Sequence, residues 1–259
     1  MKFNPGFGIR PVYNPMGFEY DSDCFGPSVE NRTLDAIRGS LRDPQASGPA
    51  IVYSIAMDVG KRCHLPLLER MHLLYGVVMY APGAIGHEPV RSQGHIHKIS
   101  SWSGCSTPEV YEIWDGEAII YMQESGDDDP GRCFAVHARP GEVVIVPPGW
   151  THATISADSR RPLVFGAWCD RDYGFVYDKV RAHGGIAWFP VIDSDGHLSW
   201  EANPTYRPSQ LICKSPDHHP ELGIVQGEPI YTTFERNPDT FAYVPDPRLK
   251  RDAWINYVP

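Results

Sequence analysis

The sequence has no excess of positive charge and no long apolar segment. Lys and Arg together number 23 against 32 Asp and Glu, so the formal net charge is −9 and the pI is near 5.6. This balance argues against a nucleic-acid or anionic-membrane surface. No segment approaches the ~18 apolar residues of a membrane span, and the N-terminus lacks the apolar run of a signal peptide. An anionic substrate would therefore need a local cationic or backbone-amide site.

Closely spaced cysteine pairs are also missing. The six cysteines are scattered and form no Cys-x-x-Cys pair, which predicts reduced thiols and a cytosolic protein rather than a disulfide framework. The chain has no repeat of solenoid period and no low-complexity tract. With 259 residues, 42% of them apolar and 21% charged, the composition is that of a globular protein with one sizeable core, or of a compact domain with extended arms.

What the chain does have is a succession of short β-rich segments. Between Val77 and Trp168 these segments are separated by Gly/Pro turns, a pattern typical of an all-β sandwich or barrel. We expect strands at 77–80, 109–114, 117–123, 133–137, 142–146, 152–155 and 163–168. A further β-rich run covers residues 50–57, and 184–192 is predicted to be a strand followed by a hairpin turn.

Two short helices are expected before these strands and a proline-rich region after them. Apolar residues at helical spacing predict one helix within 28–42 and a second from Pro66 to Gly76. Nine prolines in the last 56 residues exclude long helices there. We therefore divide the chain into an N-terminal arm with a short helix (1–47), a β-barrel domain (48–200) and an extended Pro-rich C-terminal region packed on the barrel (201–259).

Three histidines and one glutamate in the β-rich region have the spacing of a metal site. His95 and His97 are two residues apart on an extended segment, so their side chains can point the same way. Glu109 begins a strand that turns at Asp115-Gly116, and His152 follows a Pro-Pro-Gly turn and begins another strand. Three imidazoles and one carboxylate on the inward faces of neighbouring strands suit a first-row divalent metal with open positions left for a ligand.

These residues fall into two motifs that resemble the signature of the cupin superfamily. The first is Gly-His-x-His at 94–97 followed by Glu-x6-Gly at 109–116, with a longer polar insert at 98–108 between them. The second is Gly-x5-Pro-x-Gly-x2-His at 141–152, with Ser156 at the position of the family's final Asn. The resemblance implies an all-β cupin fold, which is a double-stranded β-helix or jelly-roll barrel. It also implies one metal ion with four ligands: His95, His97, Glu109 and His152.

Within the cupins, residues from about 48 to 175 are similar to one family, the cupin-type glucose-6-phosphate isomerases best known from archaea. The similarity rests on Ser92, two residues before the glycine of the first motif, and on Tyr111 in Glu-Val-Tyr. It continues in Asp-Tyr-Gly at 172–174 and in Tyr53 on an early strand. The resemblance implies that four residues bind the phosphate end of a sugar: Tyr53, Ser92, Gly94 through its amide, and Tyr173.

Two positions depart from the pattern of that family. Where the family has a phosphate-contacting threonine, this sequence has a residue near Val78. Where the family has a histidine just before Asp-Tyr-Gly, this sequence has a residue near Arg171. A guanidinium offers a bidentate fork to a phosphate, so Arg171 is a candidate to compensate for the lost hydroxyl. The alternative for Arg171 is a plain surface charge.

The resemblance implies a metal-dependent aldose–ketose isomerase that acts on glucose 6-phosphate and fructose 6-phosphate. A divalent ion, Fe²⁺ first and Mn²⁺, Ni²⁺ or Zn²⁺ as alternatives, would polarise the sugar carbonyl and stabilise an enediolate. Glu109 is the candidate base of a proton-transfer route, and a direct hydride shift between the two carbons is the other route. Tyr111 would position the sugar hydroxyls or polarise O1. The family also implies a homodimer that works in glycolysis and gluconeogenesis.

Two other functions fit the same ligand set. Three His and one Glu also hold iron in acireductone-type dioxygenases, so an iron-dependent cupin dioxygenase is one alternative. A non-catalytic cupin that binds sugar is the other, although the intact ligands argue against it. Oxygen uptake with a candidate substrate would favour the first alternative, and sugar binding without turnover would favour the second.

Overall fold

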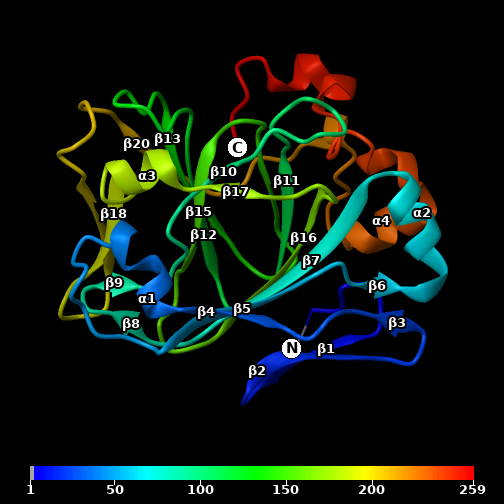
Figure 1. Ribbon diagram of the computed structural model, residues 1–259, viewed down its shortest axis with the longest axis horizontal. Coiled ribbons are helices and arrows are strands. Elements are labelled where there is room, and N and C mark those ends of the chain that lie inside the picture. Colours follow the sequence, from blue (N-terminus) through cyan, green and yellow to red (C-terminus); the bar gives the residue numbers. More distant parts are fainter. Residues whose placement is uncertain (1–2) are drawn as a thin grey trace.

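Two β-sheets form the body of the protein, and the computed structural model describes residues 3–259 (Figure 1). The larger sheet has six strands in the order β14 (Val143–Val146), β11 (Glu109–Asp115), β16 (Leu163–Asp170), β7 (Leu73–Tyr80), β5 (Ile51–Met57) and β4 (Glu30–Thr33). The smaller sheet has four strands in the order β15 (Thr151–Ser156), β12 (Ala118–Gln123), β13 (Cys133–Ala138) and β20 (Leu211–Lys214). Strand β20 runs parallel to β13, and the other neighbouring pairs in these two sheets are antiparallel. Because two sheets form the body of the protein, the all-β prediction is confirmed.

Short hairpins and helices surround the two main sheets. The two-stranded sheets are β1 (Ile9–Tyr13) with β2 (Met16–Tyr20), β3 (Cys24–Phe25) with β6 (Gly60–Lys61), β8 (Ala84–Ile85) with β9 (Glu88–Pro89), β10 (Ile96–His97) with β17 (Phe175–Val176), and β18 (Trp188–Ile192) with β19 (Leu198–Ala202). The α-helices are α1 (Leu34–Ile37), α2 (Leu65–Arg70), α3 (Asp178–Ala182) and α4 (Ile230–Arg236). The 3₁₀ helices are η1 (Arg38–Ser40), η2 (Arg62–His64), η3 (Pro220–Leu222), η4 (Pro238–Phe241) and η5 (Pro247–Trp254). Within residues 3–259, none of these helices has the length and apolarity to cross a membrane.

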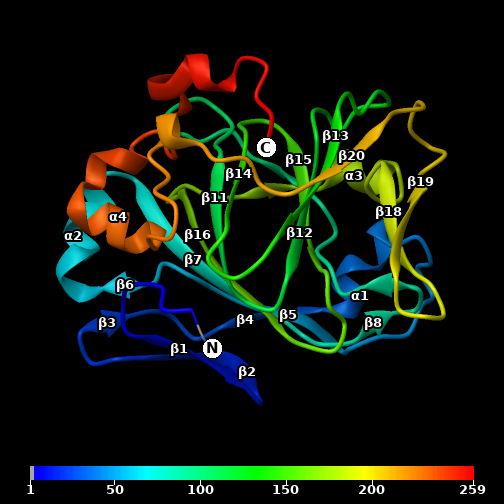
Figure 2. The same cartoon turned by 180° about the vertical axis from the view of Figure 1, so that it is seen from behind.

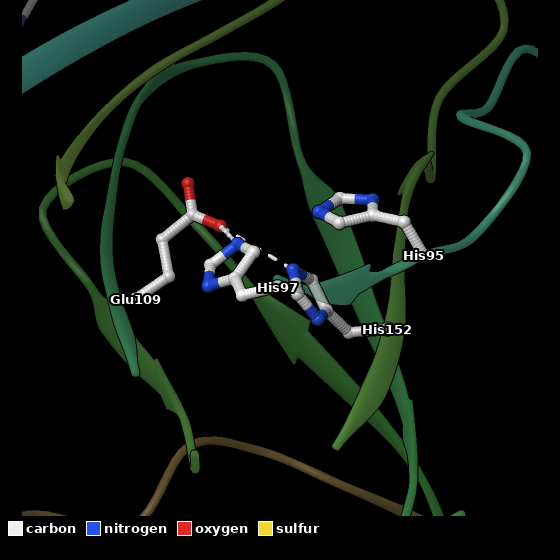
Figure 3. Close-up of side chains that lie close together, drawn as sticks. All are labelled: His95, His97, Glu109 and His152. Atoms are coloured by element: carbon white, nitrogen blue, oxygen red, sulfur yellow. Dashed lines mark hydrogen bonds and ion pairs between the residues drawn. The ribbon is translucent and has the colours of Figure 1, made fainter. Parts of the chain in front are cut away.

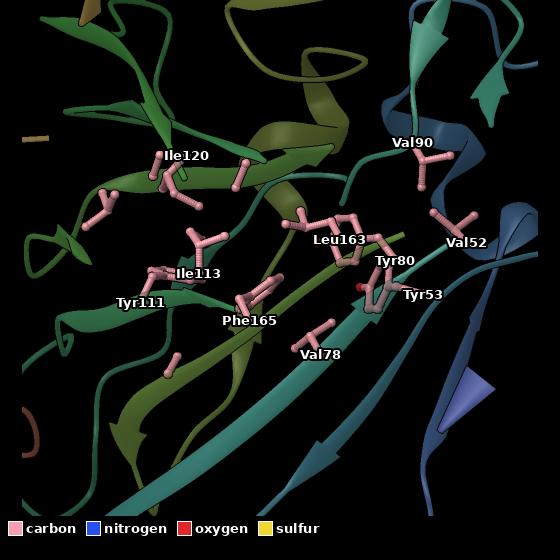
Figure 4. Close-up of a cluster of buried hydrophobic side chains, with 14 of the residues drawn as sticks. Val52, Tyr53, Val78, Tyr80, Val90, Tyr111, Ile113, Ile120, Leu163 and Phe165 are labelled. Carbon is pink, nitrogen blue, oxygen red and sulfur yellow. The ribbon is translucent and has the colours of Figure 1, made fainter. Parts of the chain in front are cut away.

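The central strands of the six-stranded sheet bury both of their faces. In β7 every residue is buried, and the alternation of side chains sends Val78 between the two sheets and Tyr75 and Val77 to the outer face. Figure 4 shows the inner set, in which Val78 and Phe165 of the larger sheet share one hydrophobic cluster with Ile120 of the smaller sheet. A strand buried on both faces has a continuous apolar run rather than an alternating one, as β7 does.

The C-terminal region packs against the outer face of the six-stranded sheet. Trp168 of β16 is fully buried there, with its ring centroid 5.5 Å from Tyr231, 4.8 Å from Phe234 and 5.7 Å from Phe241. Figures 1 and 2 show α4 and the later short helices on this side of the protein, and α3 with β18 on the opposite side. The proline-rich region therefore contributes to a hydrophobic core, and short helices occupy the intervals between its prolines.

The short helix predicted within residues 28–42 is confirmed, and it covers residues 34–40. Residues 30–33 form the edge strand β4, paired with β5, and the helical part is limited to α1 and η1. Thr33 sets the boundary because its hydroxyl accepts a 3.3 Å hydrogen bond from the Ala36 amide and caps the helix. Leu34 and Ile37, at helical spacing, are buried as predicted, but β pairing takes the residues that precede them.

The second helix ends earlier than predicted, at Arg70 instead of Gly76. His72 has a left-handed backbone with a φ of 53°, which interrupts a helix. The apolar residues that follow pair with β5 and β16, so tertiary pairing overrides the local helical spacing. Strand β7 therefore begins at Leu73, four residues before the predicted strand. The strand predicted at 184–192 is likewise limited to its second half, β18.

A carboxyl group is buried on the outer face of β11. Glu112 is fully buried, and its two oxygens accept hydrogen bonds from the Ile230 amide at 2.8 Å and from the Trp114 indole at 3.0 Å. Glu112 therefore joins the barrel to the first residue of α4. Burial raises the pKa of Glu112 to about 8, although both hydrogen bonds favour the ionised form.

We predict that Glu112 makes the stability of the fold depend on pH. Its folded-state pKa lies above the ordinary value of 4.5, so its contribution is fully present below that value and is lost as the pH rises through about 8. Glu112→Gln cannot ionise and keeps an acceptor for the Ile230 amide. Between about pH 5.5 and 8.5, the free energy of unfolding should therefore fall less in the variant than in wild type. The difference between the two falls should be on the order of 3 kcal/mol. Urea unfolding at the two pH values measures this difference.

The matched control for this prediction is Glu19→Gln, at a side chain that is 63% exposed. This variant should keep the pH dependence of wild type over this range, because it leaves the buried carboxyl group of Glu112 unchanged. Other titrating groups are common to all three proteins and cancel in the comparison. If Glu112→Gln and wild type lost the same stability over this pH range, the assignment of the titrating group to Glu112 would be wrong.

Candidate metal centre and substrate cavity

Three imidazoles and one carboxylate meet in a single cluster (Figure 3). One ligand atom from each of His95, His97, Glu109 and His152 lies within 4.8 Å of the corresponding atoms of the other three. His97 belongs to β10 and His95 precedes that strand, whereas Glu109 begins β11 and His152 is the second residue of β15. The structure thus brings together the four side chains that the sequence motifs single out, three from different strands and His95 from the residue before β10.

Hydrogen bonds orient two of the imidazoles. His97 Nδ1 lies 2.8 Å from the Thr107 carbonyl oxygen, and His152 Nδ1 lies 3.2 Å from that of Trp150. A carbonyl oxygen only accepts, so each Nδ1 carries a proton, and each Nε2 can offer a lone pair once the proton it shares with Glu109 is lost. The two Nε2 atoms lie 3.2 and 3.3 Å from Glu109 Oε2. A carbonyl partner on the outer nitrogen is the usual support for a metal-binding histidine.

His95 provides the open nitrogen of the cluster. Its Nε2 is buried and has no hydrogen-bond partner, and its ring centroid lies 4.3 Å from that of His152. A buried polar atom without a partner is costly. Three imidazole nitrogens and one carboxylate oxygen are a donor set that suits first-row divalent metals. The residues present therefore fit a divalent metal ion.

The charges within the cluster also favour a cation. Burial opposes the ionised form of Glu109, but its hydrogen bonds with His152 and His97 hold its pKa well below the usual value. Burial, together with the neighbouring His152 and His97, lowers the pKa of His95 well below its usual value. Despite burial, the hydrogen bond to Glu109 raises the pKa of His97. A metal ion that binds here takes the place of the proton shared around the carboxylate.

The cluster lies on the wall of a cavity. His95 and Glu109 line this cavity together with Tyr111, whose hydroxyl donates a 2.7 Å hydrogen bond to Glu109 Oε2. The other carboxylate oxygen, Oε1, lies 3.3 Å from the Cys169 thiol. Burial and the charge of Glu109 raise the pKa of Tyr111 well above its usual value, so this phenol stays protonated and remains a donor.

Tyr53, Ser92 and Tyr173, which were predicted for the phosphate end of a sugar, also line the cavity. Tyr53 stacks on Tyr80 with ring centroids 4.9 Å apart. Ser92 Oγ accepts a 3.1 Å hydrogen bond from the Thr154 amide, which holds the segment before the first histidine against β15. Tyr173 is the most exposed of the three, with 44% of its surface accessible. The cavity wall therefore carries hydroxyl groups beside the metal cluster.

The structure places Gly94 and Arg171, also predicted for the phosphate end, outside the residues that line the cavity. Gly94 has a φ of +89°, and a Cβ there would lie 2.7 Å from Ile186 Cγ2, so this close turn into His95 requires glycine. Arg171 forms a forked ion pair with Asp58, with distances of 2.7 and 2.8 Å. Its guanidinium is already engaged, which corrects the expectation that Arg171 faces a phosphate.

Arg32, Gln93 and Tyr177 line the same cavity and were not singled out in the sequence. Residues 30–33 were not predicted to form a strand, so nothing in the sequence placed Arg32 near the site. In a strand, Glu30 and Arg32 lie on one face, and both line the cavity. The signal that could have found Arg32 was therefore the β-strand alternation of residues 30–33.

We predict that His95→Ala and His152→Ala each abolish tight binding of a divalent metal, because each removes one of four ligands. Calorimetric titration with Mn²⁺ or Zn²⁺ should give an affinity at least about 100-fold weaker than that of wild type. Elemental analysis after gel filtration should find wild-type protein loaded and both variants depleted.

His218→Ala serves as the control for these two variants. His218 is exposed and lies outside the cluster, so its loss should leave metal affinity unchanged. A His95→Ala protein with the metal content of wild type would show that the ligands are misassigned.

The family model and the curated relatives that match this chain carry the same description. The family model described as glucose-6-phosphate isomerase (GPI) matches residues 50–209. The glucose-6-phosphate isomerase of Thermococcus litoralis is 28% identical over 215 residues, which cover 80% of this chain and 100% of that protein. The glucose-6-phosphate isomerase of Sinorhizobium medicae is 27% identical over 135 residues, which cover 52% of this chain and 58% of that protein.

A solved structure of oxalate oxidase is 17% identical, with a TM-score of 0.35, and the match covers 48% of this chain and 54% of that one. The match to the family model is more extensive. It spans more than half of the 259 residues and includes all four side chains of the metal cluster. The chain therefore belongs to the cupin-type glucose-6-phosphate isomerase family.

Proposed function

We propose that this protein interconverts glucose 6-phosphate and fructose 6-phosphate in a metal-dependent reaction. One observation carries the proposal: a cluster of three imidazoles and one carboxylate lies on the wall of a cavity that also presents phenol and serine hydroxyls. Such a site suits aldose–ketose isomerisation, because the carbonyl oxygen gains negative charge while neighbouring hydroxyls must be held in place. Membership of the family supports the choice of sugar.

The four clustered residues would hold one divalent metal ion: His95, His97, Glu109 and His152. We propose Fe²⁺, with Mn²⁺, Ni²⁺ and Zn²⁺ as alternatives. When bound, the ion supplies Lewis-acid polarisation of the sugar carbonyl. Binding, orientation and proton transfer belong to the residues of the chain.

Glu109 and Tyr111 are our assignments for proton transfer and for positioning. Isomerisation removes a proton from C2 of the aldose and returns one to C1, while the proton of the O2 hydroxyl passes to O1. Glu109 Oε2 contacts two imidazoles and Tyr111, so we assign the transfer of the carbon-bound proton to Oε1. Tyr111 holds the carboxylate in place and lies beside the substrate hydroxyls. In the alternative route, hydrogen passes directly between the carbons, and Glu109 only binds.

The family also leads us to propose a homodimer and a cytosolic location. The six cysteines are free thiols, a state that the reducing cytosol maintains. Size-exclusion chromatography with light scattering tests the oligomeric state. A monomer at working concentrations would contradict the dimer and leave the chemistry unaffected.

We predict that metal-loaded protein isomerises glucose 6-phosphate and loses this activity to a strong chelator. Activity should return when Fe²⁺ or Mn²⁺ is added back, because the polarising ion is restored. A coupled assay for fructose 6-phosphate measures the rate. Absence of turnover by metal-replete protein would rule out this substrate pair, and oxygen uptake without isomerisation would favour the dioxygenase alternative.

We predict that Glu109→Gln lowers kcat by at least about 100-fold and that Tyr111→Phe lowers it about 10-fold. Elemental analysis must accompany both variants, because Glu109 is also a metal ligand. Product formed in deuterated water distinguishes the routes: proton transfer incorporates solvent deuterium at carbon, whereas a hydride shift does not. Wild-type turnover by metal-loaded Glu109→Gln would contradict the role of this carboxylate as base.

A further inference from the structure

A phosphorylated sugar brings negative charge into a protein whose net charge is already −9. A phosphate monoester carries about −1.5 to −2 at pH 7, so its binding calls for a local cation. Among the described residues that line the cavity, Arg32 is the one lysine or arginine. The acidic residues on the same wall are Glu30 and Glu109, and Glu109 belongs to the metal cluster.

Arg32 reaches the cavity from β4, the edge strand of the six-stranded sheet, which runs beside β5 in Figure 1. Its Cα pairs with that of Tyr53. The side chain is 26% exposed, and its ion pair with Glu30, at 3.2 Å, involves a partner that is 71% exposed. The Nε of Arg32 is buried without a hydrogen-bond partner. Because an unpaired buried donor is costly, this Nε is available to an acceptor on a ligand in the cavity.

Other hydrogen-bond donors surround Arg32. Tyr53 and Tyr177 line the same cavity as Arg32, and burial raises the pKa of both phenols, so both stay protonated. Gln93 Oε1 accepts a 3.0 Å hydrogen bond from Arg181 Nε, so the amide nitrogen of Gln93 is left as a donor. Two protonated phenols, an amide and a guanidinium thus border the same cavity.

We infer that Arg32 binds the phosphate group of the substrate, with Tyr53, Tyr177 and Gln93 as further donors. The inference rests on the proposed function and names the residue that selects a phosphorylated sugar over a neutral one. The planar guanidinium can contact two phosphate oxygens, and the exposed Glu30 can turn to solvent when the anion binds. Arg32 lies on β4, in the N-terminal part of the chain that precedes the family match at 50–209.

Arg32→Gln tests the inference in full-length, metal-loaded protein by separating KM from kcat. KM for glucose 6-phosphate should rise about 10- to 100-fold, whereas kcat at saturation should change less than about threefold. Arg32→Lys should restore part of the affinity because it keeps the charge without the fork. Glu30→Gln should lower KM because it removes the competing carboxylate. Arg160→Gln, at a side chain that is 86% exposed and outside the cavity, is the control and should match wild type.

Calorimetric titration with glucose 6-phosphate and with glucose separates a phosphate contact from general damage, and it needs no turnover. Arg32→Gln should lose affinity for glucose 6-phosphate and leave the weaker binding of glucose unchanged. An equal loss for both sugars, or a fall in kcat with unchanged KM, would point to a structural role and overturn the inference.

The two proposals fail separately. If wild type binds glucose 6-phosphate without isomerising it, the proposed function is wrong, and a selective loss of binding in Arg32→Gln still supports the phosphate contact. If wild type isomerises the sugar and Arg32→Gln keeps the wild-type KM, the function stands and the inference about Arg32 is overturned. Absence of any binding of glucose 6-phosphate by wild type overturns both.

Discussion

Two backbone hydrogen bonds hold together the segments that carry the candidate metal ligands. The His95 amide donates to the His152 carbonyl at 3.0 Å, and the His152 amide donates to the His95 carbonyl at 2.9 Å. This antiparallel bridge aligns the segment before β10 with β15, so that the imidazoles of both segments converge on Glu109. The metal-ligand atoms come from parts of the chain that are distant in sequence. Because they are buried among apolar strands, bulk water cannot hydrogen-bond to them.

Strand β11 carries two buried carboxyl groups with opposite properties. Glu109 faces the cavity, where hydrogen bonds with imidazoles lower its pKa against the effect of burial. Glu112 faces the C-terminal region, where burial without a cationic partner raises its pKa to about 8. Residues three apart on a strand lie on opposite faces of the sheet. One strand therefore provides an ionised ligand for a cation on one side and a hydrogen-bond acceptor for α4 on the other.

The polar groups of the cavity are distributed in a way that suits a sugar phosphate. The metal cluster gathers donors for a cation that would polarise the carbonyl end, while Arg32 and the neighbouring phenols gather hydrogen-bond donors for an anionic end. The same wall includes apolar side chains such as Val78 and Phe165, and a low-polarity lining strengthens electrostatic interactions. In the proposed function, a molecule must satisfy both ends at once, which favours a phosphorylated sugar over a neutral one.

Much of this arrangement was predictable from the sequence, because strand alternation and ligand spacing are local properties. The short strands and the four clustered side chains, including His95 and His152, follow from that local pattern. The ends of two helices and the roles of two arginines did not, because they depend on which distant segment lies alongside. Asp58 engages Arg171, whereas pairing of β4 with β5 turns Arg32 toward the cavity. The sequence by itself thus determined which residues could bind a metal. Only tertiary packing decided which arginine faces the cavity, because the orientation of a guanidinium depends on the partners that the fold brings next to it.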